Sequence, residues 1–182
     1  MRELSLNVLD IAQNSIVAGA SLIELIVKED TVGDRLTLTI ADNGCGMTPE
    51  QLARVRDPFY TTRTTRKVGM GIPLFRMAAE MSGGDLSIES QVGHGTTVTA
   101  TFGLTHIDRM PLGDMADTVS ALIRLNDDRD FVYRHEVDGR SFELDTRQLR
   151  EVLEDVPLSE PDVINWIKAA MAEGLLPLNS QA

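Results

Sequence analysis

Four short segments within the first 103 residues alternate apolar and polar side chains, and they come in two consecutive pairs. A period of two residues is typical of strands with one buried face. Patterns with helical spacing stand before the first pair and between the two pairs. We therefore predict a two-layer α/β sandwich, in which helices cover one face of a mixed sheet. The apolar positions of the predicted strands are Ile23, Leu25 and Val27; Leu36, Leu38 and Ile40; Leu86 and Ile88; and Val98, Ala100 and Phe102.

Three helices are predicted to form the second layer. Residues 3–18 carry apolar side chains at helical spacing, and a second helix begins at residues 48–51, where Thr-Pro-Glu-Gln forms a capping pattern. A third helix begins near Pro73 and ends at the Gly-Gly pair of residues 83–84. Residues 57–70 are rich in Thr, Arg and Gly and are predicted to form a loop.

The pattern restarts beyond Gly103. Asp138 and Gly139 lie between two alternating segments, which is a strong signal for a hairpin turn. We predict a small α+β extension over residues 105–182, next to a main domain over residues 1–104. The role of this acidic extension stays open, since a protein-docking module and a stabilising flap fit the sequence equally well. The helices predicted in it span residues 112–125, 146–155 and 159–173.

The charge of the chain limits its partners. The 182 residues carry a net charge of −11, of which residues 1–103 contribute −3 and residues 104–182 contribute −8. Nucleic acid and anionic membranes bind basic surfaces, so neither is expected to be a partner. No apolar run approaches the roughly 20 residues that span a bilayer, and the N-terminus does not resemble a signal peptide. Because the single Cys45 also agrees with a reducing compartment, we predict a cytoplasmic protein.

Basic residues gather in one short stretch of this acidic chain. Five of the nine Lys and Arg residues within residues 1–103 lie between positions 54 and 67, and Asp57 is the only acid among them. A positive segment in an otherwise acidic protein indicates a specific anionic ligand. The five basic residues are Arg54, Arg56, Arg63, Arg66 and Lys67.

Asp42 ends the second predicted strand and begins the sequence Asp-Asn-Gly-Cys-Gly-Met. Parity places its side chain on the same face as Leu36 and Ile40, toward the core. An unpaired carboxylate is costly there, and the exocyclic amine of an adenine would satisfy it. Gly44 and Gly46 would let a flat ring approach the backbone. Taken alone, a tight turn explains these residues about as well.

Thr96 has the corresponding parity in the fourth predicted strand. It is in register with Val98, so its hydroxyl is predicted to face the same apolar layer as Asp42. A single Thr in a strand is by default a β-branched filler. A hydroxyl and a carboxylate directed into one apolar layer are better explained by a polar ligand that both contact.

Asp10 and Asn14 lie four residues apart in the first predicted helix, and therefore one above the other on its surface. A carboxylate and an amide oxygen in this arrangement could activate a water molecule and hold Mg²⁺. For the pair alone, a solvated polar face is the commoner explanation.

Gly69 and Gly71 precede the third predicted helix. Backbone NH groups at a helix start bind phosphate, and glycines allow a close approach. The pattern is neither a dinucleotide-binding fingerprint nor a P-loop, and it is weak when taken singly.

Together and in this order, the segments resemble the GHKL superfamily of ATP-binding domains (the Bergerat fold), which includes DNA gyrase, heat-shock chaperones, MutL and sensor histidine kinases. The resemblance covers about residues 3–103, and it consists of the N, G1, F, G2 and G3 boxes. These boxes are Asp10-x-x-x-Asn14, Asp42-x-Gly44-x-Gly46, Asp57-Pro58-Phe59-Tyr60-Thr61-Thr62-Arg63, Gly69-x-Gly71 and Gly93-His94-Gly95-Thr96-Thr97.

The resemblance implies that the chain binds ATP and Mg²⁺. Asp42 would accept a hydrogen bond from the adenine amine, and Thr96 would reach the base through water. Asn14 would ligate Mg²⁺, and residues 57–70 would form a lid over the nucleotide. The resemblance further implies cofactor contacts at Gly44, Gly46, Thr62, Gly69 and Gly71.

Three departures from the family pattern bear on activity. Asp10 stands at the general-base position, where Glu is usual, and its shorter side chain disfavours efficient hydrolysis. Lys67 takes the place of the first glycine of the G2 box. No dimerisation helix with a phosphoacceptor histidine is expected before the first predicted helix. The histidines are interpreted as structural or surface residues, and they are His94, His106 and His135.

Three functions stay open at this point. The main prediction is a regulatory phosphotransferase that passes the γ-phosphoryl group of ATP to a separate protein partner, because the F, G2 and G3 boxes resemble those of kinases. The alternatives are an ATPase or ATP-gated switch, and an ATP sensor without turnover. Phosphoryl transfer depends largely on positioning, so a kinase tolerates the weak base Asp10 better than an ATPase would.

Overall fold

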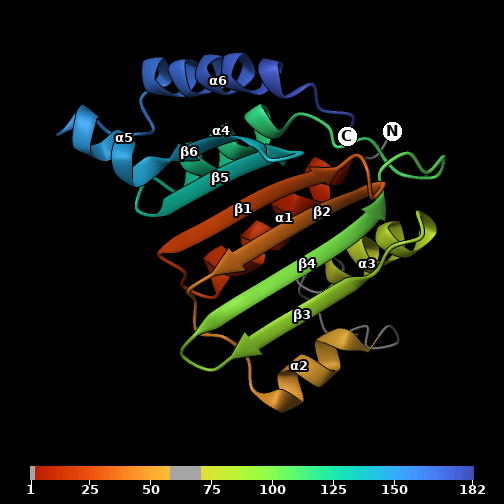
Figure 1. Ribbon diagram of the computed structural model, residues 1–182. Helices are drawn as coiled ribbons and strands as arrows, with labels where there is room; N and C mark the ends of the chain where they lie inside the picture. The colour runs from red at the N-terminus through yellow and green to blue at the C-terminus, as the bar shows by residue number, and fades with distance from the viewer. Residues whose placement is uncertain (1–2, 58–70) are drawn as a thin grey trace.

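The computed structural model describes residues 3–57 and 71–182, which form one six-stranded sheet with helices packed on it (Figure 1). The order of the strands across the sheet is β3-β4-β2-β1-β5-β6. The strands are β1 (Leu22–Asp30), β2 (Arg35–Asp42), β3 (Leu86–Gln91), β4 (Gly95–Gly103), β5 (Asp130–Val137) and β6 (Arg140–Asp145). The helices are α1 (Leu4–Val17), α2 (Pro49–Arg56), α3 (Gly71–Met81), α4 (Met115–Leu125), α5 (Thr146–Leu153) and α6 (Pro161–Leu175), with a 3₁₀ turn at Leu176–Leu178.

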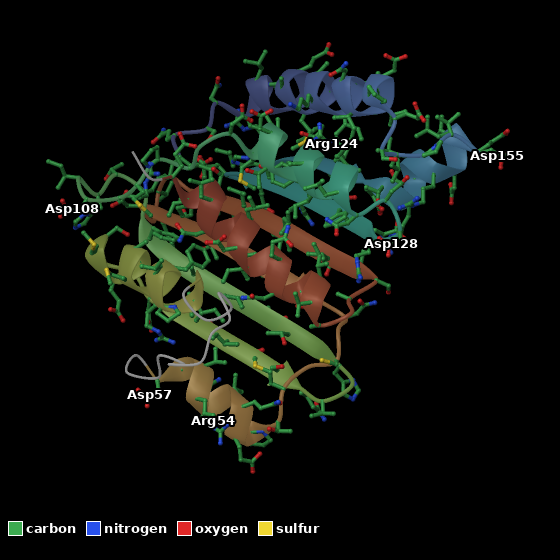
Figure 2. All side chains as sticks on the ribbon, turned by 180° about the vertical axis from the view of Figure 1, so that it is seen from behind. Arg54, Asp57, Asp108, Arg124, Asp128 and Asp155 are labelled. Atoms are coloured by element: carbon green, nitrogen blue, oxygen red, sulfur yellow. The ribbon has the colours of Figure 1, made fainter. Side chains whose placement is uncertain are left out.

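The sheet is mixed, as the sequence predicts. β1 pairs with β2, β2 with β4, and β3 with β4, all antiparallel, whereas β1 and β5 run parallel. Helices α1, α3 and α4 lie behind the sheet in Figure 1 and in front of it in Figure 2, so they cover the same face. The predicted α/β sandwich with helices on one face is therefore confirmed.

The alternation of apolar residues sets which face of the sheet the helices cover. In β2, Leu36, Leu38 and Ile40 are at most 1% exposed, while Thr37 and Thr39 between them are half-buried. The buried side chains of the sheet pack against apolar residues of α1 and α3 in one continuous core. Burial of each such large apolar side chain contributes about 1.5–3 kcal/mol. This core positions the last residues of β2 and the first residues of β4 beside the C-terminal half of α1.

The extension adds two strands to the sheet of the main domain. β5 pairs in parallel with β1, from Leu22 opposite Asp130 to Glu29 opposite Val137. β6 pairs with β5 through the predicted hairpin, where Asp138 and Gly139 both have positive φ angles. The extension thus shares a sheet and a core with residues 3–57 and 71–104.

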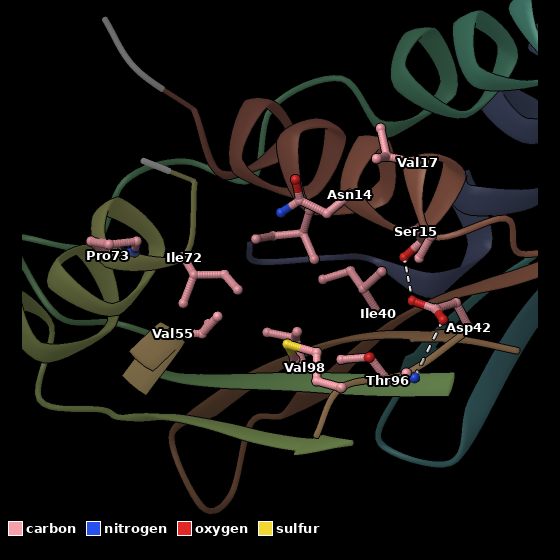
Figure 3. Close-up of a pocket in the computed structure, with 14 residues that line it drawn as sticks. Asn14, Ser15, Val17, Ile40, Asp42, Val55, Ile72, Pro73, Thr96 and Val98 are labelled. Atoms are coloured by element: carbon pink, nitrogen blue, oxygen red, sulfur yellow. Dashed lines mark hydrogen bonds between the residues drawn. The ribbon is translucent and has the colours of Figure 1, made fainter. Parts of the chain in front are cut away.

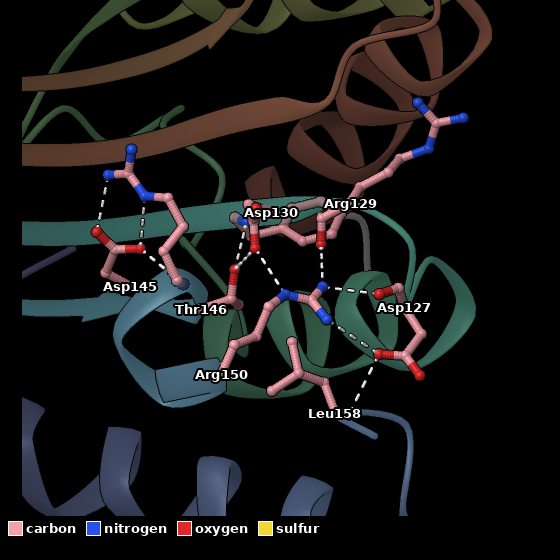
Figure 4. A network of polar contacts seen from close by, with 9 residues as sticks. Asp127, Arg129, Asp130, Asp145, Thr146, Arg150 and Leu158 are labelled. Atoms are coloured by element: carbon pink, nitrogen blue, oxygen red, sulfur yellow. Dashed lines mark hydrogen bonds and ion pairs between the residues drawn. The ribbon is translucent and has the colours of Figure 1, made fainter. Parts of the chain in front are cut away.

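An arginine in α5 ties the loop before β5 to the rest of the extension (Figure 4). Arg150 donates through Nε to Asp130 Oδ1 at 2.8 Å, and through one terminal nitrogen to the carbonyl oxygens of Asp127 and Arg129, both at 2.7 Å. The Asp127 carboxylate in turn accepts from the backbone NH of Leu158 at 3.1 Å. The guanidinium of Arg150 therefore joins α5 to the start of β5 and to the loop before it through charge-assisted hydrogen bonds.

The C-terminal segment is fastened to a buried carboxylate of β1. Glu29 is 1% exposed, and it accepts from Ser180 Oγ at 2.5 Å and from the backbone NH of Gln181 at 2.8 Å. His135 Nε2 lies 2.7 Å from Glu29 Oε1, and its Nδ1 lies 3.1 Å from the hydroxyl of Tyr133. Through Glu29 of β1, these contacts join β5 and the C-terminal segment to the sheet. No helix in the described part of the chain is both long and apolar enough to cross a membrane.

The stability of the protein is expected to depend on the ionisation of Glu29. Burial alone would raise the pKa of this carboxyl, but hydrogen bonds from His135, Ser180 and Gln181 outweigh burial and lower the pKa below its ordinary value of 4.5. The ionised carboxylate therefore stabilises the fold fully above pH 4.5, and this contribution is lost as the pH falls below that value. Glu29→Gln places an amide NH₂ among donors, which at neutral pH should cost about 1–3 kcal/mol in urea unfolding.

A matched substitution separates this effect from general acid denaturation. Glu143→Gln changes an exposed carboxylate of β6 and should leave the free energy of unfolding nearly unchanged. The difference between the parent and Glu29→Gln should shrink as the pH falls through the lowered pKa. A difference that stays constant from pH 7 to pH 3 would show that the charge on Glu29 does not stabilise the fold.

Candidate nucleotide site

A cavity of about 280 Å³ opens between α1 and the ends of β2 and β4 (Figure 3). Its lining is mostly apolar, and its few polar groups come from the segments that the sequence singles out. The polar lining residues are Asn14, Ser15, Asp42 and Thr96, and the apolar ones include Ile11, Ile40, Met47, Val55, Ile72 and Val98.

Asp42 is held at one end of this cavity by three hydrogen bonds. Ser15 Oγ donates to Asp42 Oδ2 at 2.6 Å, and the backbone NH groups of Gly44 and Thr96 donate to Oδ1 at 2.9 Å and 3.3 Å. A carboxylate offers about four lone-pair positions. Three donors leave about one acceptor position on this side chain, and Asp42 lines the cavity. The arrangement can receive one further donor, such as an amine of a bound ring.

Strand parity correctly places Asp42 and Thr96 in one layer. The two residues are direct register partners in the antiparallel pair of β2 and β4, and both line the cavity. Thr96 Oγ1 lies 2.8 Å from Ser90 Oγ, which also accepts from the backbone NH of Met47 at 2.9 Å. The hydroxyl of Thr96 thus belongs to a small polar network at the rim of an apolar cavity.

Ser15 and Ser90 are site residues that the sequence reasoning missed. Ser15 is 3% exposed and follows Ile11 by four residues, so it lies on the apolar face of α1. A small polar residue on that face is the signal that could have identified it, because a buried hydroxyl needs a partner. Ser90 gives no comparable signal, because its role depends on the pairing of β3 with β4.

The glycines after β2 allow close approach between segments of the protein itself. Gly46 has φ +68°, and a Cβ built there would lie 2.0 Å from the carbonyl oxygen of Gln91. A Cβ on Gly44 would lie 2.9 Å from the carbonyl oxygen of Ala18. Gly46 also lines the cavity, whereas Gly44 does not belong to its lining. Both glycines therefore fix the wall behind the cavity, and this requirement is independent of any ligand.

Asp10 and Asn14 face two different hollows of the surface. Asn14 lines the cavity together with Asp42, while Asp10 is exposed and lines a neighbouring groove between α1 and α3. Gly71, the first residue of α3, packs beside Asp10, and a Cβ on it would lie 3.3 Å from the Asp10 Cβ. The start of α3 thus meets α1 between the two hollows, and Ile72 and Pro73 continue the cavity wall.

Several predicted contacts fall on residues that the structure does not describe. Thr62 and Gly69 lie outside the described residues, and so does most of the predicted lid. The basic residues Arg63, Arg66 and Lys67 lie there as well. Within residues 3–57 and 71–182, no group of three or more His, Cys, Asp or Glu side chains is arranged to hold a metal ion.

Comparison with known proteins identifies the family of this fold. Residues 1–106 match the family described as histidine kinase-, DNA gyrase B- and HSP90-like ATPases. The match covers more than half of the 182 residues, and the chain belongs to this family. It therefore carries a histidine-kinase-like ATP-binding domain.

Curated relatives resemble only the first part of the chain. The non-motile and phage-resistance protein of Caulobacter vibrioides is 33% identical over an alignment of 97 residues, which covers 50% of this chain and 12% of the relative. Sensor protein kinase FleS of Pseudomonas aeruginosa is 38% identical over 92 residues, covering 50% of this chain and 23% of the relative. Histidine protein kinase DivJ of C. vibrioides is 38% identical over 68 residues, covering 35% and 11%. The chain thus matches a small part of these longer proteins.

A solved structure supports the fold alone. The crystal structure of the N-terminal domain of a DNA repair protein matches with a TM-score of 0.51 and 18% identity, covering 80% of this chain and 53% of that chain. This coverage extends beyond the family match, in agreement with a sheet that continues into the extension.

Proposed function

We propose that the cavity binds ATP together with Mg²⁺, and that the protein is a regulatory phosphotransferase that passes the γ-phosphoryl group to a separate protein in the cytoplasm. The observation that carries this proposal is Asp42, which lines an apolar cavity and keeps about one acceptor position after its three hydrogen bonds within the protein. An adenine ring presents an amine at its edge and apolar faces, so it matches both features.

The rest of the nucleotide would extend from Asp42 toward the start of α3. Asn14 lines the same cavity and offers an amide oxygen, a ligand that Mg²⁺ accepts. Mg²⁺ in nucleotide sites keeps several waters and phosphate oxygens as ligands, so a single protein ligand is sufficient. The metal neutralises charge on the phosphates when it is bound. The first NH groups of an α-helix have no partner within the helix, so the start of α3 would favour the phosphates on the Gly71 side of the cavity.

Transfer to a protein is favoured over hydrolysis by the position and length of Asp10. This exposed carboxylate borders the groove beside the cavity, where an incoming hydroxyl or imidazole of another protein can reach it. Two of the relatives above carry the word kinase in their names, which supports the same choice. The second candidate is an ATPase or ATP-gated switch, and it is supported by the family description, which includes gyrase-like ATPases.

Incubation with γ-labelled ATP and Mg²⁺, with and without cell extract, tests the proposed function. Label on another protein supports the phosphotransferase, and free phosphate in the absence of extract supports the ATPase. If ATP binds but neither labelled protein nor free phosphate forms, the protein is an ATP sensor without turnover. Asp42→Asn is the control in each reaction, because labelling that persists with this variant comes from another enzyme in the extract.

Replacement of Asn14 tests the metal role separately. Asn14→Ala should remove the tightening of ATP binding by Mg²⁺, because the variant lacks the amide oxygen while the adenine end of the cavity is unchanged. Calorimetric titration with ATP, in Mg²⁺ and in EDTA, measures the effect. The parent should bind ATP about tenfold more tightly in Mg²⁺ than in EDTA, which corresponds to about 1.4 kcal/mol. If Mg²⁺ increases the ATP affinity of Asn14→Ala as much as that of the parent, Asn14 is not a ligand of the metal.

A further inference from the structure

A second hollow, of about 470 Å³, lies beside the proposed nucleotide cavity. It runs between α1 and α3 on the helix-covered face, and the segment after β4 closes its far end through Asp108 and Met110. Figure 2 shows Asp108 on this segment, next to the end of α3. The family match ends at residue 106, so part of this groove is built by residues beyond the family domain.

The walls of the groove expose apolar side chains to solvent. Leu6 of α1 is 51% exposed, and Met77 and Met81 of α3 are 54% and 58% exposed. Ile107, which precedes the lining residue Asp108, is 93% exposed. Contiguous exposed apolar side chains mark interaction surfaces. Methionine adapts its shape to different partners, so this lining suits a protein segment more than a rigid small molecule.

Among the described residues that line the groove, all charged side chains are acidic. Glu3, Asp10 and Asp108 are the charged side chains of its lining, and no Lys or Arg is among the described lining residues. Opposite charge on the two sides of an interface guides association and selects the partner. The occupant that complements this surface is therefore basic, with apolar side chains between its charges. A groove between two helices accommodates such a segment as an amphipathic helix.

We propose that this groove docks a basic amphipathic segment of the protein that accepts the phosphoryl group. The docking of such a segment is inferred from the exposed apolar side chains and the acidic residues of the groove. The assignment of the segment to the phosphoacceptor rests on the proposed function. Asp10 lies in the groove, and Asn14, one helical turn further along α1, lies in the cavity. A segment seated between α1 and α3 thus lies beside the place proposed for the γ-phosphate.

The probe for this proposal is a synthetic 14-residue peptide with Leu and Met on one helical face and Lys on the other. A peptide of the same composition in scrambled order controls for charge, because the protein is acidic overall. Binding is measured by fluorescence anisotropy of the labelled peptides at 0.15 M salt, where attraction between exposed charges more than about 8 Å apart is largely screened and contacts within the groove are kept. The amphipathic peptide should bind about tenfold more tightly than the scrambled peptide.

Matched variants locate the binding site. Glu3→Gln combined with Asp108→Asn, and separately Met77→Ser, should each weaken peptide binding about fivefold or more, the equivalent of about 1 kcal/mol. Glu151→Gln combined with Asp155→Asn removes the same charge at exposed positions in and after α5 and should change binding less than twofold. Because Leu6, Met77 and Met81 are about half exposed, Met77→Ser removes little from the core.

A fluorescent ATP analogue, titrated on the same variants, separates the two proposals. Unchanged analogue binding with weakened peptide binding supports the groove as a docking site. Equal weakening by the groove pair and the α5 pair, or equal binding of the two peptides, would overturn it in favour of unspecific charge attraction. Failure of the parent protein to bind the analogue, with peptide binding intact, would refute the proposed function and its phosphoacceptor assignment but leave the docking groove.

Discussion

Asp42→Asn is expected to lower the affinity for ATP by about a hundredfold or more, while the fold stays intact. The carboxylate has about one acceptor position left after its bonds with Ser15, Gly44 and Thr96. In the variant, Oδ1 can keep both backbone NH donors, and the new NH₂ group can donate to Ser15 Oγ. The same group then turns a second N–H toward the cavity, against the adenine amine. The site thereby changes from an acceptor to a donor at the atom that is proposed to identify the base.

Calorimetry with ATP and a thermal unfolding curve measure the two halves of this expectation. Ser15→Ala is the matched control, because it removes one internal bond of Asp42 and leaves the carboxylate itself. Ser15→Ala should weaken ATP binding by about tenfold at most, because the lost bond joins two protein groups and water can take the freed acceptor position of Asp42. ATP affinity in Asp42→Asn equal to that of the parent would show that Asp42 does not contact the base.

The position of Asp42 could be predicted because strand geometry has few alternatives. Side chains alternate across a strand with a period of two, so Ile40 fixed the side on which Asp42 would lie. The same rule placed Thr96 in that layer, and the antiparallel pairing of β2 with β4 made the two residues direct partners. The start of α2 and the end of α3 could also be predicted, because Thr48 caps α2 and the Gly-Gly pair at residues 83–84 follows α3.

The parallel pairing of β1 with β5 could not be predicted in the same way. It joins Leu22 to Asp130 across more than 100 residues, and no local pattern encodes a contact of that length. The extension therefore looks like a separate unit in the sequence, although its strands continue the sheet. The polar stripe of α1 shows a related limit, since Asp10 and Asn14 share a helix face but the start of α3 separates their hollows.

Gly46→Ala is expected to destabilise the fold by about 3–5 kcal/mol, a large part of the total stability of a domain. Two costs combine at this position. The backbone has φ +68°, a conformation that costs a residue with a Cβ about 1–2 kcal/mol. The new Cβ would also lie 2.0 Å from the carbonyl oxygen of Gln91, a backbone atom held at the end of β3. Relief of this clash requires the segment after β2 to move away from the sheet. Urea unfolding at pH 7 measures the loss.

Gly93→Ala isolates the conformational part of that cost. Gly93 has φ +80°, but a Cβ built on it meets no heavy atom within 4 Å. It should therefore lose only about 1–2 kcal/mol, and it should keep nucleotide binding. Gly46→Ala should weaken nucleotide binding as well, because Gly46 and Met47 both line the cavity and would shift together. Equal destabilisation by the two substitutions would mean that the segment after β2 can move away from Gln91 without a further loss of stability. In that case the position of Asp42 depends on its own hydrogen bonds more than on the packing of this segment.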